Sequence, residues 1–256
     1  MTQPAVGARA TFLYGGGRSV LAYLVTPALI ATSLIALYVW ISSKDLDSIE
    51  QRRINLDVIL EATREHIELT LVSTVLVVII AIPLGVLLTR DFFGSITAPA
   101  IAVFNVGQAT PTIALLGLIM LWWRFGFWAA VAALVAYTTL SVLRNTMVGL
   151  SQLDESIIES ARGMGMSKFK VLWRIELPLA VPVIMAGVRT ALVLNVATAT
   201  LAVFAAAGGL GEIINTGIVQ GRDRVTIVGS VITAALALSI DYVAGLAEDF
   251  LRPRGL

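Results

Sequence analysis

The sequence predicts an all-α integral membrane protein with six transmembrane helices, and three observations support that fold class. Hydrophobic residues make up 57% of the 256 residues and charged residues only 14%, against roughly 25% charged in a typical soluble domain. Several uncharged runs are as long as the about 20 residues that cross a bilayer as a helix. The aromatic content of 7% is too low, and the apolar runs are too long, for an outer-membrane β-barrel.

The first 65 residues are expected to form a unit of their own. Residues 1–19 are polar and rich in glycine, which indicates a cytosolic tail. The uncharged run Val20–Ile41 is too long for the apolar core of a signal peptide, so it predicts a retained membrane helix. The charged segment Ser42–Glu65 follows and is expected to lie outside the cytoplasm. The single histidine, His66, is expected at the mouth of the next span.

The remaining five spans are bounded by charged or glycine-rich segments. We expect the third span to be broken early, because polar residues and Pro111 interrupt it. The expected spans are His66–Thr89, Ala98–Trp123, Phe127–Leu143, Pro178–Phe204 and Val225–Leu246, with a tight turn at Arg124–Gly126, a long cytosolic loop from Arg144 to Leu177, a glycine stop at Gly208, Gly209 and Gly211, and a polar return from Glu212 to Arg224.

Polar residues inside the spans are candidates for a translocation path. Hydrocarbon offers their hydrogen bonds no partner, so such residues face protein or water. The candidates are Asn105, Gln108, Thr110, Pro111, Asn195 and Thr198. The alternative for Asn105, Gln108 and Thr110 is that small polar residues bond one helix to another. Arg189 and Asp241 lie at similar depths in two spans and are expected to form a structural ion pair.

The long cytosolic loop has the pattern of a helix, a sharp turn and a second helix. Asp154 can cap the first helix through its carboxylate. Gly163 and Gly165 can supply left-handed backbone angles for the turn, and Ser167 can cap the second helix. We expect Pro178 to close the segment, and small or unbranched side chains at the tip, namely Ala161, Met164 and Met166, to suit docking into a groove on another protein.

This loop resembles the one that marks the permease subunits of ATP-binding-cassette (ABC) importers. The pattern is carried by Glu159, Ala161, Gly165, Ile175 and Leu177-Pro178. One departure is Ser160, a small residue where the pattern prefers alanine. The resemblance implies that the residues coupling this chain to a cytosolic ATPase are Glu159, Ser160, Ala161, Arg162, Gly163, Met164 and Gly165.

The same resemblance implies an architecture and partners. It places a five-helix type I importer core at residues 66–250 and treats residues 1–65 as an addition with one extra helix. Strings such as Gln108-Ala-Thr-Pro-Thr, Leu143-Arg-Asn-Thr and Ala207-Gly-Gly-Leu-Gly resemble the permeases of osmoprotectant importers. These carry glycine betaine, choline, carnitine and related quaternary amines. The implied partners are two ATPase subunits, a second permease, identical or paralogous, and an external binding protein.

Absent motifs narrow the chemistry. The sequence has no phosphate-binding loop of the form G-x-x-x-x-G-K-[ST], so we expect no enzyme activity in this chain, with ATP and Mg²⁺ bound by the partner ATPase. It has no cysteine, and we expect neither a cofactor nor a metal site. The net charge of +1 gives no indication of nucleic acid binding. The alternatives are a permease for methionine or another amino acid and, less favoured, an ion-coupled carrier that uses Arg189 and Asp241.

An even number of spans places both termini on one side of the membrane. Lys and Arg are somewhat more frequent in the segments on the side of the long loop, which the positive-inside rule assigns to the cytosol. We therefore expect both termini in the cytosol of a bacterial or archaeal cell, with the protein in the cytoplasmic membrane.

Overall fold

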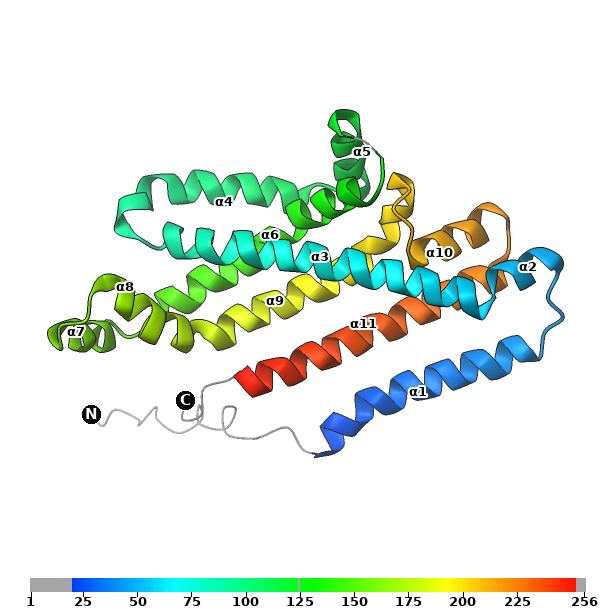
Figure 1. Ribbon diagram of the computed structural model, residues 1–256, viewed down its shortest axis with the longest axis horizontal. Coiled ribbons are helices and arrows are strands. Elements are labelled where there is room, and N and C mark those ends of the chain that lie inside the picture. Colours follow the sequence, from blue (N-terminus) through cyan, green and yellow to red (C-terminus); the bar gives the residue numbers. More distant parts are fainter. Residues whose placement is uncertain (1–19, 124, 252–256) are drawn as a thin grey trace, which may run out of the picture.

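The computed structural model describes residues 20–123 and 125–251, and every regular element in them is a helix (Figure 1). The expected tail at residues 1–19, Arg124 of the expected turn, and residues 252–256 lie outside the described part. The elements are α1 (Val20–Ser42), α2 (Ser48–Arg53), α3 (Leu56–Leu88), η1 (Asp91–Phe93), α4 (Gly94–Ala109), α5 (Thr112–Trp122), α6 (Phe127–Ser151), α7 (Glu155–Gly163), α8 (Lys168–Val171), the π-helix η2 (Leu172–Glu176), α9 (Leu177–Ala199), η3 (Thr200–Ala205), α10 (Leu210–Val219) and α11 (Asp223–Leu251).

Six helical stretches of the described chain are long and apolar enough to cross a membrane, which confirms the predicted number of spans. They are Tyr23–Ser42, Leu56–Leu88, Asp91–Ala109, Phe127–Ser151, Lys168–Ala205 and Asp223–Leu251. The long helices run side by side in an elongated bundle, while α5 lies across them (Figure 1).

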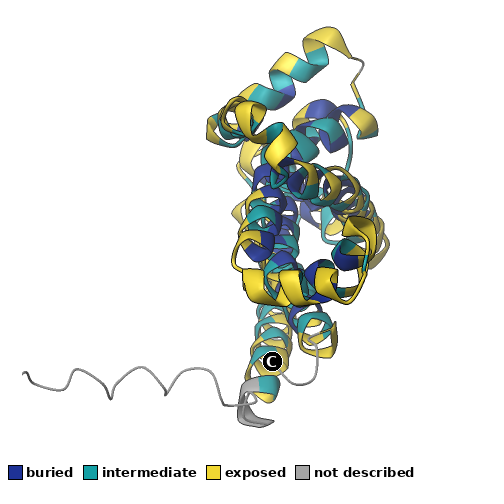
Figure 2. Ribbon diagram, turned by 90° about the vertical axis from the view of Figure 1, so that its left-hand side faces the viewer, coloured by how far each residue is buried: buried dark blue, intermediate teal, exposed yellow. Residues whose placement is uncertain are grey.

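The core of the bundle lies where α6 packs between α3 and α9. Leu69, Val77 and Leu140 are fully or almost fully buried there. Glycine allows the closest approach: a Cβ on Gly187 of α9 would lie 2.6 Å from the Cβ of Asn145 on α6. Figure 2, which looks along the bundle, shows the buried residues gathered where these helices meet. Because α1 packs mainly on α11 and lies outside this core, it is an added helix, as the sequence indicated.

The third expected span is wrong in its extent, because the chain breaks into two helices. α4 ends at Ala109 and α5 begins at Thr112, with Thr110 in an extended conformation (φ −73°, ψ 130°). Pro111 has no amide hydrogen to donate, and its ring disfavours helical angles at the residue before it. The candidate span is therefore Asp91–Ala109, and α5 is a separate short helix.

The fifth expected span is wrong in where it begins. Pro178 does not close the preceding segment, because α8, η2 and α9 follow one another without a break from Lys168 to Ala199. The π-helical turn Leu172–Glu176 lies directly before Pro178. A π turn changes the hydrogen-bond register, so a proline without an amide hydrogen fits at the point where the α-helical register resumes.

His66 also differs from expectation, because it is fully buried and does not lie at the mouth of a span. Helix α3 begins at Leu56, ten residues earlier along the chain. The ring Nε2 of His66 lies 2.9 Å from the carbonyl oxygen of Val196 on α9. His66 therefore links the outer part of α3 to α9.

The two ends of the bundle carry different elements. The turn between α7 and α8 and the helix η1 lie at one end, called here the loop end; α2 and α10 lie at the other, and α11 runs from there toward the loop end (Figure 1). At this opposite end three ion pairs hold α2 against α10 and α11: Arg222 to Asp47 at 2.7 Å, Arg224 to Glu50 at 3.1 Å and Arg53 to Glu212 at 3.3 Å.

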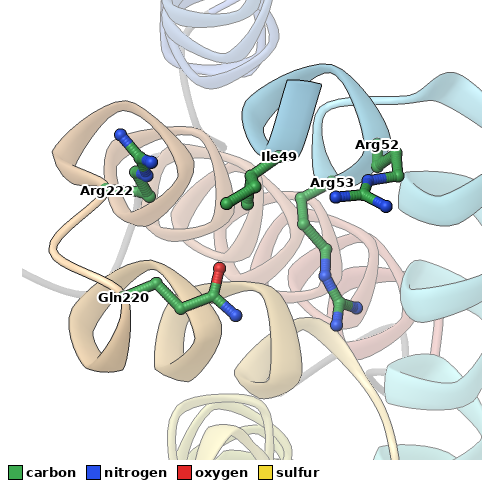
Figure 3. A pocket seen from close by; sticks show the side chains of 5 residues that line it. All are labelled: Ile49, Arg52, Arg53, Gln220 and Arg222. Carbon is green, nitrogen blue, oxygen red and sulfur yellow. The ribbon is translucent and has the colours of Figure 1, made fainter. Parts of the chain in front are cut away.

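A cavity of about 420 Å³ opens beside α2, at the end opposite the loop end. It is lined by Ile49, Arg52, Arg53, Gln220 and Arg222 (Figure 3). The hydrogen bond from the backbone N–H of Glu50 keeps the pKa of the Asp47 carboxyl below its usual value, so Asp47 stays ionised opposite Arg222. The charged segment is thus tied to α10 and α11 through α2.

Candidate functional site

The predicted turn at the loop end is formed, and its caps are the predicted ones. The Asp154 carboxylate accepts a hydrogen bond from the backbone N–H of Ser156 at 2.9 Å, and the Ser167 hydroxyl accepts one from Lys170 at 3.3 Å. The chain reverses at Gly165, which has a φ of +83°. The Met166 N–H donates to the Ala161 carbonyl at 3.2 Å, and the Gly165 N–H donates to an earlier carbonyl, as in a Schellman ending.

Two details of the turn differ from the prediction. Gly163 is the last residue of α7 and has no positive φ, so Gly165 alone takes the left-handed conformation there. Ala161 is 1% exposed and cannot itself enter a groove on a partner. Met164, by contrast, is 76% exposed. The other predicted coupling residues, Glu159, Ser160, Arg162, Gly163 and Gly165, are exposed as well.

An aromatic pair extends the exposed surface beyond the turn. Phe169 and Trp173 lie one turn apart on the helix after Gly165, their ring centroids are 6.1 Å apart, and both are more than half exposed. An apolar surface of this kind, next to an exposed methionine, is suited to contact with another protein. The spacing was visible in the sequence as an amphipathic pattern, but which side stays exposed depends on the packing of α7 against α8.

An ion pair with one buried partner, which the sequence did not reveal, fixes this segment to the bundle. Arg90, at the end of α3, donates to Glu176 through Nη2 at 2.5 Å. The Glu176 side chain is 8% exposed. Because Glu176 lies in η2, the pair joins the helix that leaves the turn to the connection between α3 and α4.

Inside the bundle the predicted pair of Arg189 and Asp241 is confirmed. Arg189 of α9 donates to both oxygens of Asp241 on α11, through Nε at 2.6 Å and Nη2 at 2.7 Å. A second carboxylate, Glu248, lies 3.5 Å from Arg189 Nη1 and was not predicted. Asp241 and Glu248 are seven residues apart, two helical turns, so they share a face of α11.

The candidate path residues divide into two groups. Asn105 and Gln108 are partly exposed on α4, where Asn105 Oδ1 accepts from Arg144 at 2.6 Å and Gln108 Nε2 donates to Ser141 at 3.2 Å. Arg144 was expected to open the cytosolic loop, but α6 continues to Ser151, so Arg144 lies inside a span. The predicted loop therefore begins after Ser151. The charge of Arg144 lies beside the polar residues of α4.

The second group lies farther along α9. Asn195 is fully buried and joins three helices, accepting from Thr138 of α6 at 3.2 Å and donating to Thr74 of α3 at 2.8 Å. Asn195 was predicted to line the path, but these bonds join helices, as small polar residues commonly do in bundles. Thr198 donates to a carbonyl of its own helix, and Thr110 does the same on α4. Pro111 is exposed between α4 and α5.

No group of three or more His, Cys, Asp or Glu side chains in the described residues is placed to hold a metal ion. The described geometry is suited to transmitting movement and to offering polar contacts. It has an exposed turn at one end, a helix that runs from that turn into the bundle, and a polar face on α4 and α6.

Relatives of known description match most of the chain in sequence. The choline transport system permease protein OpuBB of Bacillus subtilis is 39% identical over 77% of this chain and 90% of its own length. The glycine betaine/carnitine/choline permease OpuCB of the same organism is 37% identical over the same shares. The osmoprotectant import permease OsmY of Salmonella typhimurium is 35% identical over 81% of this chain and 86% of its own length.

Solved structures agree on the fold. The inward-facing MetNI methionine ABC transporter matches with a TM-score of 0.68 and 22% identity, covering 76% of this chain and 96% of the other. An amino acid ABC transporter solved with histidines matches with a TM-score of 0.65 at 17% identity, covering 81% of this chain and all of the other. At these identities the similarity shows the fold alone. Residues 81–254 match the family described as binding-protein-dependent transport system inner membrane component, so the chain belongs to this family of ABC importer permeases.

Proposed function

We propose that this chain is the permease subunit of an ATP-driven importer for quaternary-amine osmoprotectants of the glycine betaine, choline and carnitine type. The observation that carries the substrate class is the 35–39% identity to permeases with these substrates in their names, over about three quarters of the chain. The exposed turn at Gly165 carries the coupling to an ATPase, because it is the accessible tip of an element fixed to the core by the ion pair of Arg90 with the buried Glu176.

The proposed function implies several partner subunits. Two cytosolic ATPase subunits bind ATP and Mg²⁺, and this chain needs no cofactor of its own. A second permease, identical or paralogous, completes the membrane part, and an external binding protein delivers the solute. The loop end then faces the cytosol of a bacterial or archaeal cell with both termini, and α2 and α10 face outward. The ATPase contacts are Glu159, Ser160, Arg162, Met164 and Gly165, with the buried Ala161 shaping the turn.

The solute path runs along the polar face of α4 and α6. It includes Asn105, Gln108, Thr110 and Pro111, with Thr198 near its outer end, while Asn195 holds the helices together. Neutral amides and hydroxyls offer dipoles to a methylated cation without holding it too firmly to leave. High affinity then belongs to the binding protein, where an aromatic cage can take the trimethylammonium group.

An importer for methionine or another amino acid is the second candidate, because the methionine transporter shares this fold and the fold alone does not separate the two substrate classes. Both candidates are tested by one experiment. The complete complex is reconstituted in vesicles, and uptake of labelled glycine betaine, choline and methionine is measured with ATP, without ATP and with an inactivated ATPase subunit. The binding protein is added or omitted in each case.

We expect uptake of a quaternary amine that requires ATP and the binding protein and that persists when ionophores collapse ion gradients. Uptake of methionine alone would refute the substrate class and leave the ABC assignment intact. Uptake that needs no ATPase would refute both and support an ion-coupled carrier.

A further inference from the structure

Arg144 is an exposed cation at membrane depth. It lies in α6, and its Nη2 donates to Asn105 Oδ1 at 2.6 Å across the contact between α6 and α4. Asn105 is eleven residues from Gly94, where α4 begins at the loop end. At 1.5 Å per residue, the contact lies about 16 Å along α4 from that end, and both residues lie in helices that are long and apolar enough to cross a membrane.

Nothing in the described part of the chain neutralises this charge, since no carboxylate there lies within ion-pair distance of Arg144. A second copy that applied the same face would not neutralise it either, because residues 94–151 and 177–211 contain no Asp or Glu. An arginine that faces lipid inside a membrane span is costly. The face around Arg144 is therefore a protein-enclosed or water-filled surface that can receive an anion.

The neighbouring amide side chains place hydrogen-bond donors and an acceptor at different positions along this surface. Asn105 accepts from Arg144 through Oδ1, which leaves its Nδ2 as a further donor without a partner in the described residues. Gln108, three residues farther from the loop end, uses Nε2 to bond Ser141 and leaves its carbonyl oxygen as an acceptor. Donors and acceptor are therefore separated by about 4.5 Å along α4.

We infer that Arg144 and Asn105 form a carboxylate-binding subsite on the translocation path, which holds the carboxylate of a zwitterionic quaternary amine. This inference rests on the proposed function and refines its substrate class. A guanidinium and a carboxylate form two parallel charge-assisted hydrogen bonds. Glycine betaine and carnitine carry a carboxylate near the trimethylammonium group, whereas choline carries a hydroxyl group. With the carboxylate at Arg144, the trimethylammonium group lies toward the carbonyl oxygen of Gln108, so the carboxylate faces the cytosolic end.

The test compares glycine betaine with choline in the reconstituted complete complex. Arg144→Gln removes the charge, and Arg144→Lys keeps it without the planar fork. Asn105→Asp places a competing carboxylate beside Arg144, and Asn105→Ala is its matched partner without that carboxylate. The rate and the half-saturating concentration are measured for each solute, and the amount of assembled complex is measured for each variant.

We expect Arg144→Gln to lower betaine uptake per complex by about tenfold or more, as the loss of a hydrogen bond to a charged group predicts, and to lower choline uptake much less. Arg144→Lys should keep a larger part of the betaine uptake. Asn105→Asp should lower betaine uptake strongly relative to choline, whereas Asn105→Ala, which only removes one donor, should lower it less. If Arg144→Gln does not assemble, the Asn105 pair gives the same answer.

Equal loss for both solutes in Arg144→Gln and Asn105→Asp would overturn the subsite. If the wild type imports betaine and no choline, the two Arg144 variants are compared with each other. The subsite would then be overturned if Arg144→Lys lost as much betaine uptake as Arg144→Gln. Vesicles of phosphatidylcholine with and without phosphatidylglycerol separate solute carboxylate from lipid phosphate, and an Arg144→Gln effect confined to the anionic vesicles would also overturn it. Failure of wild type to import any quaternary amine would instead refute the proposed function.

Discussion

Breaking the ion pair between α9 and α11 should destabilise the bundle by a predictable amount. Arg189 meets Asp241 through two contacts of 2.6 and 2.7 Å, and the side chains are 27% and 34% exposed. Removing one partner of a buried pair costs about 3–5 kcal/mol, and the partial exposure favours the lower end. An unpaired charge at the centre of a membrane costs about 2.5–3.5 kcal/mol, which agrees. We predict that Arg189→Gln lowers the free energy of unfolding by about 3 kcal/mol.

The neighbouring carboxylate sets an order among the variants. Arg189→Gln should be the most damaging because it leaves both Asp241 and Glu248 without the guanidinium. Asp241→Asn should be intermediate. Glu248→Gln should cost less than about 1 kcal/mol, because its contact of 3.5 Å is longer. Exchanging the charges in Arg189→Asp with Asp241→Arg should recover only part of the loss, since Glu248 then faces a new carboxylate.

The assay is unfolding of the purified permease in detergent micelles by increasing SDS, followed by circular dichroism, with expression in the membrane as a second readout. Arg64→Gln is the control for removal of an arginine, because Arg64 forms an exposed pair with Glu68 one helical turn away and should change stability by no more than about 0.5 kcal/mol. Single variants as stable as this control would refute a stabilising pair. They would leave Arg189 and Asp241 available for ion coupling.

Three further predictions concern the turn and the core. Gly165→Ala forces a side chain into a backbone with φ +83° and should reduce ATP-coupled uptake. Gly163→Ala adds its Cβ in open space at a helical residue and should reduce uptake less. Equal losses of uptake in the two variants would contradict this prediction. Asn195→Ala should cost about 1–3 kcal/mol because buried Thr74 loses its donor and the contact with Thr138 is lost. The same unfolding assay measures this cost, and uptake per folded molecule shows whether Asn195 lines the path. The hydrogen bond from the Ser156 N–H lowers the pKa of the Asp154 carboxyl. Capping of α7 by Asp154 should therefore persist above pH 3.8 and fade as the pH falls through the lowered pKa. Hydrogen exchange should then show fraying at the start of α7, and the Asp154→Asn variant should show no such pH dependence.

Local chemistry accounts for what the sequence predicted well. Asp154 and Ser167 cap helices because a side-chain oxygen reaches amides two or three residues away, and both bonds are present. Gly165 turns the chain because only glycine adopts its backbone angle without strain. The pairing of Arg189 with Asp241 followed from depth alone, since helical rise converts sequence position into distance. Each of these inferences needed little knowledge of the tertiary fold.

The failures occurred where neighbouring helices decide the outcome. Arg144 was assigned to a loop because a charge ended the apolar run, but α4 offers Asn105 as a partner, so α6 continues past it. Glu176 gave no sign of burial until Arg90 was placed beside it. Pro178 indicated a helix boundary, yet the π turn before it allows the helix to continue.

The continuous helix from the turn into the bundle has a mechanical consequence. Between Lys168 and Ala199 the chain has no interruption other than the π turn at Leu172–Glu176. A displacement applied at the tip must therefore pass along α9, whose contacts include the Arg189 pair with α11. The pair of Glu176 and Arg90 joins the π turn to the connection that leads into α4. Movement at the turn can thus reach α4, and with it Asn105 and Arg144, without passing through a flexible loop.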